Sequence, residues 1–185
     1  EGQLGDGSTT ARWLPVPVVG PGGVGLLEGI LQVGAGSFHA CARSVAGTVQ
    51  CWGDNLEAQL GDAQLHQDCA GRDCSPVPST VAGEGGAGSL GDVANLAVGW
   101  SHTCAARSDG TAVCWGLGDM GQLGDAPAHQ TCTIFSFTVD CSDYPVGVDA
   151  LGGGGSLDGV IAVTAGQGHS CAILSSGTLG CWGLD

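Results

Sequence analysis

The residues in this chain best suited to chemistry are its cysteines and histidines, because they recur at fixed spacing. Three segments each contain a His, a Cys two residues later, and a Cys-Trp-Gly beginning ten residues after that Cys: 39–53, 102–116 and 169–183. Such residues could hold a zinc ion, or the cysteines could form disulfides. Structural zinc normally takes four ligands, and its usual signature contains two closely spaced cysteines. Each segment offers only three soft ligands and the chain has no Cys-x-x-Cys, so the pattern favours disulfides.

The ten cysteines fall into five local pairs. In each repeated segment the two cysteines flank a short loop ending in Gly47, Gly110 or Gly177, and glycine suits the left-handed backbone that such a hairpin loop needs. This register places the two cysteines opposite each other, about 4.5–5.5 Å apart at Cα, within reach of a disulfide. The predicted disulfides are Cys41–Cys51, Cys104–Cys114, Cys171–Cys181, and, in the variable segments, Cys69–Cys74 and Cys132–Cys141. They indicate an oxidising compartment, so we expect a secreted or cell-surface protein.

The sequence gives little support for catalysis. A nucleophilic site needs Ser or Cys together with His and a carboxylate, but the cysteines are assigned to disulfides and no Gly-x-Ser-x-Gly occurs. No paired carboxylates recur in the manner of a glycosidase. We therefore expect that the protein is not an enzyme. A lyase or glycosidase built on a β-propeller fold is a remote alternative.

Calcium is the one cofactor alternative that the sequence leaves open. Hard cations bind clustered carboxylates, and acidic residues flank the two disulfides predicted in the variable segments. The candidates are Asp68, Asp73, Asp140 and Asp143. No twelve-residue calcium loop is present, so the expected cofactor is none.

The charge of the chain restricts its partners. Its formal net charge is −14, with four basic residues, all Arg. Four scattered arginines cannot form the basic patch that nucleic acid or an anionic membrane requires. No run of 18 apolar residues exists, so we expect no membrane insertion. The acidity suits a solvent-exposed protein or one with cationic partners.

The chain repeats a longer pattern of elements. A Gln-Leu-Gly-Asp phrase is followed by a variable stretch, a Pro/Val segment, a Gly-rich spacer, an apolar strand and the Cys-bearing hairpin. Each repeat therefore holds about four short antiparallel strands, the content of one β-propeller blade, and the fold class is all-β. The repeats are 1–54, 55–118 with insertion 62–75, and 119–185 with insertion 125–143. Such insertions map to loops on one face, often the binding face.

Several repeated side chains are expected to be structural. The predicted blade-packing residues are Trp52, Trp115, Trp182, His39, His102 and His169, with each His bonding a neighbouring backbone carbonyl. Asp6, Asp62 and Asp125 follow each Leu-Gly and are expected to form turns. His66 and His129 lie in the insertions and are expected to face solvent.

These phrases resemble those of the regulator of chromosome condensation repeat family. The resemblance rests on Gly53-Asp54-Asn55 with Gln59-Leu60-Gly61, on Gly116 through Gly124, and on the three hairpins. The paired hairpin cysteines are similar to the bacterial extracellular branch and differ from the eukaryotic nuclear exchange factor. The resemblance implies a seven-bladed propeller and protein partners, as in the propeller-type inhibitor of β-lactamases.

Three repeats are fewer than a closed propeller needs, which is at least about four. We therefore expect a piece of a longer chain, a trimmed core, or a subunit that assembles with copies of itself. The leading functional hypothesis is a secreted, disulfide-stabilised propeller segment that serves as a protein-binding or structural module through its insertions. The alternative is a self-assembling subunit of an extracellular ring or filament, whose partners would be copies of itself.

Overall fold

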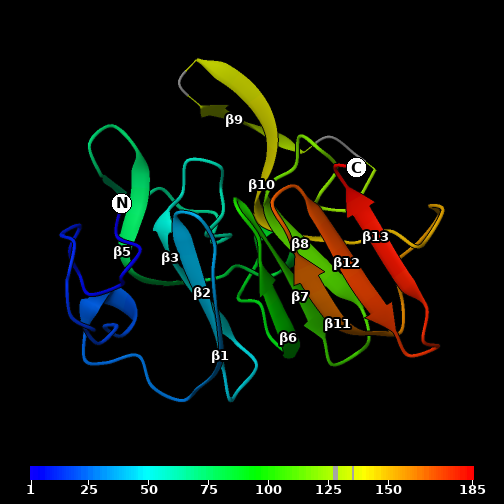
Figure 1. Cartoon of the computed structure of the whole chain (residues 1–185), viewed down its shortest axis with the longest axis horizontal. Coiled ribbons are helices and arrows are strands. Elements are labelled where there is room, and N and C mark those ends of the chain that lie inside the picture. Colours follow the sequence, from blue (N-terminus) through cyan, green and yellow to red (C-terminus); the bar gives the residue numbers. More distant parts are fainter. Residues whose placement is uncertain (127–128, 135) are drawn as a thin grey trace.

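Three antiparallel sheets stand side by side in the computed structural model, which describes residues 1–126, 129–134 and 136–185 (Figure 1). Residues 127, 128 and 135 of the predicted insertion 125–143 lie outside the described residues. Helix within the described ranges is limited to two three-residue turns, η1 (Pro21–Gly23) and η2 (Glu84–Gly86). No helix among them could span a bilayer. The chain is all-β and forms part of a propeller.

Each sheet has the same inner meander of three strands. The first sheet has the order β1 (Ile30–Ala35), β2 (His39–Ser44), β3 (Val49–Asp54), β5 (Asp73–Thr80), β4 (Gln67–Asp68). The second has the order β6 (Val93–Val98), β7 (His102–Arg107), β8 (Ala112–Leu117), β10 (Phe137–Gly147), β9 (Gln130–Ile134). The third consists of β11 (Val160–Ala165), β12 (His169–Leu174) and β13 (Leu179–Gly183).

The expected four strands per blade are present in the first two sheets, with an addition from the insertions. The first two sheets have four main strands, and the insertion adds a short fifth, β4 or β9, at the outer edge. The third sheet has three strands, and its outer strand β13 pairs with no further strand among the described residues. The predicted insertions therefore contribute to the sheets as hairpins.

The sheets are offset from the sequence repeats. The outer strand β5 of the first sheet comes from repeat 55–118, while β1, β2 and β3 come from repeat 1–54. The second sheet likewise takes β10 from repeat 119–185. A repeat is therefore a unit of sequence, whereas each of the first two blades combines strands from two successive repeats.

The hydrophobic core lies between neighbouring sheets. One cluster joins the first sheet to the second and contains Val49, Leu60, Val93, Leu96 and Trp115. Another joins the second sheet to the third and contains Leu123, Val160 and Val163. The innermost strands are further linked by amide side chains, since Gln32 Nε2 donates to the Leu96 carbonyl at 2.7 Å and Asn95 Oδ1 accepts from the Val163 amide at 2.8 Å.

Candidate functional site

The hairpin cysteines pair in the register that the loop glycines predict. Cys41 faces Cys51, Cys104 faces Cys114 and Cys171 faces Cys181 across antiparallel strands. Their Cα separations are 4.1, 4.1 and 4.0 Å, and those of Cys69–Cys74 and Cys132–Cys141 are both 5.9 Å. All ten cysteines are in disulfides, so none is available as a thiolate for zinc or for nucleophilic attack.

The repeated tryptophans join successive blades. Each indole N–H donates to the Gln carbonyl of a Gln-Leu-Gly phrase: Trp52 to Gln3 at 2.9 Å, Trp115 to Gln59 at 3.1 Å, and Trp182 to Gln122 at 2.9 Å. The glycine of that phrase lies against the ring, and a Cβ on Gly61 would lie 2.4 Å from Trp115 Cδ1. The loop that leaves one sheet is thereby fixed to the next.

The repeated histidines also join blades, but their partner differs from the expected backbone carbonyl. His39 Nε2 lies 3.0 Å from Thr103 Oγ1, and His102 Nε2 lies 2.8 Å from Ser170 Oγ. Both hydroxyls belong to the following sheet. His169 is exposed at the equivalent position of the last sheet. Thr103 and Ser170 were missed by the sequence analysis, although each directly follows a repeated His and so carried a detectable signal.

Burial keeps these two bridging histidines neutral. Removal from water foremost, together with the repulsion that a second protonated histidine would add, lowers the pKa of His39 to about 3 and that of His102 to about 4. A neutral imidazole with Nε2 bonded to a hydroxyl has a structural role, and both rings are buried.

One end of the three sheets gathers the features most suited to binding. The turns from β1 to β2 and from β6 to β7, the loop after β3, and the β9–β10 hairpin all leave the sheets at this end, and the hairpin projects furthest (Figure 1). We call this end the insertion face. Its exposed large apolar side chains are Phe38 (41%), Leu65 (92%), Trp100 (43%), Met120 (45%) and Phe137 (74%).

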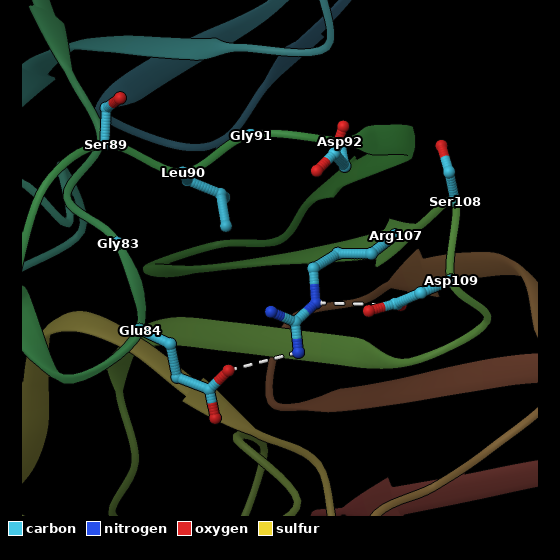
Figure 2. Close-up of a pocket in the computed structure, with 9 residues that line it drawn as sticks. All are labelled: Gly83, Glu84, Ser89, Leu90, Gly91, Asp92, Arg107, Ser108 and Asp109. Atoms are coloured by element: carbon cyan, nitrogen blue, oxygen red, sulfur yellow. Dashed lines mark ion pairs between the residues drawn. The ribbon is translucent and has the colours of Figure 1, made fainter.

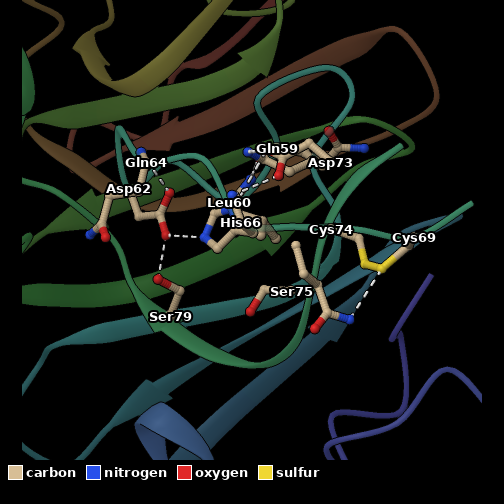
Figure 3. A network of polar contacts seen from close by, with 12 residues as sticks. Gln59, Leu60, Asp62, Gln64, His66, Cys69, Asp73, Cys74, Ser75 and Ser79 are labelled. Carbon is tan, nitrogen blue, oxygen red and sulfur yellow. Dashed lines mark hydrogen bonds and ion pairs between the residues drawn. A yellow bond between two sulfur atoms is a disulfide. The ribbon is translucent and has the colours of Figure 1, made fainter. Parts of the chain in front are cut away.

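The first insertion is organised around His66 (Figure 3). His66 Nε2 lies 2.7 Å from Asp62 Oδ2, and Nδ1 lies 3.5 Å from Asp73 Oδ2. The His66 amide also donates to Asp73 Oδ1 at 2.7 Å. The imidazole is therefore held between two carboxylates and has 11% side-chain exposure, which corrects the expectation that His66 faces solvent.

The second insertion repeats this arrangement around His129. Its Nε2 lies 2.5 Å from Asp125 Oδ2 and its Nδ1 lies 3.0 Å from Asp140 Oδ2. The His129 amide donates to Asp140 Oδ1 at 2.8 Å. With 8% side-chain exposure, His129 is also enclosed, again contrary to expectation.

The His66 cluster includes a serine but is not a nucleophilic site. Ser79 Oγ donates to Asp62 Oδ2 and not to the histidine (Figure 3). Both ring nitrogens of His66 already face carboxylates, so neither is free to take the hydroxyl proton, which general-base activation of a serine requires. The cluster therefore binds the insertion together and lacks the order of a catalytic triad.

The calcium candidates do not converge. Asp73 and Asp140 direct their carboxylates at His66 and His129, and Asp68 accepts from the Gly71 amide at 2.5 Å. In each cluster the two carboxylates lie on opposite sides of one imidazole ring. In the part of the chain that the structure describes, no group of three potential ligands is placed to hold a metal ion.

In the first repeat, the side chain bonded to the equivalent aspartate is an arginine six residues further on, not a histidine four residues further on. Asp6, which matches Asp62 and Asp125 in the repeat, bonds Arg12 Nε at 2.8 Å. Asp6 and Asp62 also accept from the backbone amide two residues on, as expected for turn-forming side chains. Each of the three repeats therefore places one cationic or protonatable side chain on this aspartate.

The opposite end of the sheets has a shallow groove of different character (Figure 2). Arg107 Nη2 lies 3.1 Å from Glu84 Oε2, and Arg107 Nε lies 4.0 Å from Asp109 Oδ1. The groove is lined by Gly83, Ser89, Leu90, Gly91, Asp92 and Ser108 besides these three. Its single cation is already paired with carboxylates, so the groove has little capacity for an anionic ligand.

Comparison with known proteins places these repeats in a family. A family model for the regulator of chromosome condensation (RCC1) repeat matches residues 1–43 and 109–173, and a second model of that repeat matches 30–59 and 93–122. The chain belongs to the RCC1 repeat family. Among RCC1-repeat proteins, Protein pim1 of Schizosaccharomyces pombe is 30% identical over 157 residues, which are 85% of this chain and 28% of that protein.

Solved RCC1 structures share the fold. Yeast RCC1 (Prp20) bound to Kap60 matches with a TM-score of 0.67 at 19% identity, over 99% of this chain and 38% of that one. Prp20p from Saccharomyces cerevisiae, whose structure is described with its binding to Gsp1p and histones, matches with a TM-score of 0.64 at 21% identity, over 85% and 34%. The chain thus spans less than two fifths of these relatives.

Proposed function

We propose that this RCC1-type propeller segment is a protein-binding module of a secreted or cell-surface protein and has no catalytic activity of its own. The observation that carries the proposal is that five exposed apolar side chains lie on the turns, loops and hairpin of the insertion face, each at least 41% exposed: Phe38, Leu65, Trp100, Met120 and Phe137. Apolar side chains clustered on one face of a soluble protein are typical of a protein interaction site.

The charge of the chain favours a cationic protein as the partner. All four arginines already bond within the chain: Arg12 to Asp6, Arg72 to Asp54, Arg107 to Glu84, and Arg43 to the Val93 carbonyl. Uncompensated carboxylates therefore dominate the surface, and basic residues around an apolar patch would complement it. The same excess of carboxylates over arginines argues against nucleic acid as a ligand.

Two further observations support the proposal. The structural relatives are described with protein partners, namely Kap60, Gsp1p and histones. Five disulfides in one small chain are typical of an oxidising compartment, which is the basis for proposing an extracellular or cell-surface location.

A capture experiment with matched variants tests this function. The tagged protein is recovered from its source cells under thiol-alkylating conditions, after cross-linking, from extracytoplasmic and cytoplasmic fractions separately. We expect extracytoplasmic protein with no alkylated cysteine and a cross-linked basic partner that Trp100→Ser loses and Leu31→Ser keeps. Leu31 is a suitable control because it is 62% exposed on the innermost strand β1. Cytoplasmic protein with alkylated thiols, or equal cross-linking by both variants, would contradict the proposal.

Self-assembly is the second candidate, and it rests on β13, which pairs with no further strand among the described residues. Three segments occupy equivalent positions, because each begins eighteen residues before the first residue of an innermost strand (Ile30, Val93 or Val160). They are 12–18, 75–81 and 142–148. Two of them complete a sheet: the Val81 amide donates to the Val49 carbonyl, and the Val148 amide to the Ala112 carbonyl, both at 3.0 Å. Segment 12–18 joins none of the three sheets. In a second copy, the Val18 amide would donate to the Leu179 carbonyl of β13.

Native mass spectrometry tests this pairing. We expect the 185-residue chain to form species at multiples of 18.2 kDa. Val18→Pro removes the donor amide and should leave monomers, whereas Val24→Ser, an exposed change outside the segment, should assemble as the wild type does. A wild-type chain that remains at 18.2 kDa would rule out assembly through this edge.

A further inference from the structure

Each insertion places a histidine ring between two aspartates, and in the second insertion both ring nitrogens of His129 are hydrogen-bonded to carboxylates, whereas His66 has one such bond, at Nε2, and an ion-pair distance of 3.5 Å at Nδ1. In both, a His lies four residues after an Asp of the Gln-Leu-Gly-Asp phrase, and a second Asp on the outer strand β5 or β10 faces the other ring nitrogen. Only the imidazolium can donate from both ring nitrogens, because the neutral ring has one donor and one acceptor. After loss of the proton, one ring nitrogen would direct its lone pair at a carboxylate.

The charges that face each ring all have the same sign. Those acting on His66 are Asp62 from the phrase and Asp73 from β5, and those acting on His129 are Asp125 and Asp140. Neutral groups complete the first cluster, since Ser79 on β5 bonds Asp62 and Asn55 bonds Asp73 at 2.7 Å. Arg72, the nearest cation along the chain, directs its guanidinium to Asp54.

The cluster electrostatics follow from this arrangement. Burial acts to lower the pKa of each histidine, but the hydrogen bonds and charges of the paired aspartates outweigh it, so the pKa values of His66 and His129 are raised above the ordinary 6.5. A raised pKa means that the folded state holds the proton more tightly than the unfolded state. The resulting stabilisation is complete below about pH 6.5 and is lost as the pH rises through the folded-state value.

Each histidine fastens its insertion at two points. Asp62 belongs to a loop that Trp115 fixes to the next sheet through Gln59, and Asp73 begins β5. His66 lies between them: its Nε2 bonds Asp62, and its Nδ1 forms an ion pair with Asp73, so the charged ring ties the middle of the insertion to both supports. The insertion disulfides Cys69–Cys74 and Cys132–Cys141 reach the outer strands at the residues next to Asp73 and Asp140, but neither disulfide contacts Asp62 or Asp125 on the Gln-Leu-Gly-Asp loop.

We propose that the Asp62–His66–Asp73 and Asp125–His129–Asp140 clusters are proton-dependent clamps that hold the insertion face in one conformation while the histidines carry their proton and release it when they lose that proton. The clamps exist whether or not the face binds protein. Only their consequence, binding that weakens as the histidines lose their proton, rests on the proposed function.

The first repeat provides the internal comparison. Asp6 is bonded by Arg12, whose side chain is 41% exposed, and an arginine keeps its charge throughout the accessible pH range. The segment that Arg12 fastens should therefore respond little to pH. Replacing His66 or His129 by Arg should transfer that behaviour to the insertions.

Hydrogen exchange of the oxidised chain, without any partner, tests the clamps. Amide protection is compared at about pH 6 and about pH 9 after correction for intrinsic exchange, together with NMR titration of the histidine rings. In the wild type, we expect residues 63–72 to lose about tenfold in protection for each pH unit between about 6.5 and the folded-state pKa of His66, and to lose no more above that pKa. His66→Arg should keep its protection at both pH values, and His66→Gln should lose it at both.

The readouts separate failure of the clamp from failure of the binding proposal. Protection of β2 and β7 in every variant shows that the sheets are folded, and His129→Arg, made separately, repeats the test in the second insertion. Equal protection of the wild-type insertion at both pH values would overturn the proposal, as would equal alkaline loss in the wild type and His66→Arg. Either result leaves the capture experiment with Trp100→Ser unaffected.

Discussion

Between about pH 6 and about pH 4.5, the free energy of unfolding is expected to fall by about 2.7 kcal/mol per pH unit because of two histidines. Burial lowers the pKa of His39 to about 3 and of His102 to about 4. In this range the unfolded chain binds two protons that the folded chain does not. Stability therefore rises with pH up to about 6.5 and is lost below it. His66 and His129 contribute no slope here, because their raised pKa values leave them protonated in both states.

Urea unfolding at several pH values measures this slope. His39→Asn and His102→Asn should each reduce it by about half, whatever their effect on absolute stability, and His169→Asn should not, because His169 is exposed at the same repeat position. The pKa of Glu57 is raised, chiefly by burial, so Glu57 makes the free energy of unfolding change with pH in the opposite direction. This contribution is the same in every variant and cancels in the comparison. An unchanged slope in the double variant would show that neither histidine is buried in its neutral form.

Replacing Trp115 by Ala should destabilise the chain by about 3–5 kcal/mol, a large part of the about 5–15 kcal/mol that holds a typical domain folded. Trp115 is completely buried in the core between the first and second sheets, and its indole N–H bonds the Gln59 carbonyl at 3.1 Å. The variant loses both the packing of the ring against Gly61 and that hydrogen bond. The midpoint of urea unfolding reports the loss.

Trp13→Ala is the matched control, because the Trp13 side chain is fully exposed in this structure. Its effect should stay within about 0.5 kcal/mol, as for most surface substitutions. If the two variants lost similar stability, Trp115 would not be the residue that fixes the loop of one blade to the next.

The parts of the fold that follow from local chemistry were predictable from the sequence. Gly47, Gly110 and Gly177 fix the hairpin loops, all three with positive φ, and the loops fix which cysteines face each other. The sequence did not show which strands make up each blade, because tertiary packing decides that β5 pairs with β3. The repeat pattern correctly indicated four strands per unit but could not show that a sheet takes its outer strand from the following unit.

The site was predicted less completely, because its contacts cross between elements. Nothing local to His39 shows that its ring reaches Thr103, 64 residues away, in place of a backbone carbonyl. The pairing of His66 with Asp62 had a local signal, the spacing of four residues, but the second carboxylate on Asp73 depends on where β5 lies. Insertions rich in polar residues suggested solvent exposure, whereas both histidines are enclosed by carboxylates.

The offset between repeats and sheets has a consequence for how such a chain can change over generations. Consider a duplication whose breakpoints coincide with a sequence repeat, such as 55–118. It would insert an outer strand that completes the preceding sheet. It would also insert a three-strand inner meander, which the outer strand of the next repeat completes. Every junction in the longer chain would then be of a kind already present. A gene for this fold can therefore gain or lose one repeat by recombination without creating a sheet that lacks a matching strand.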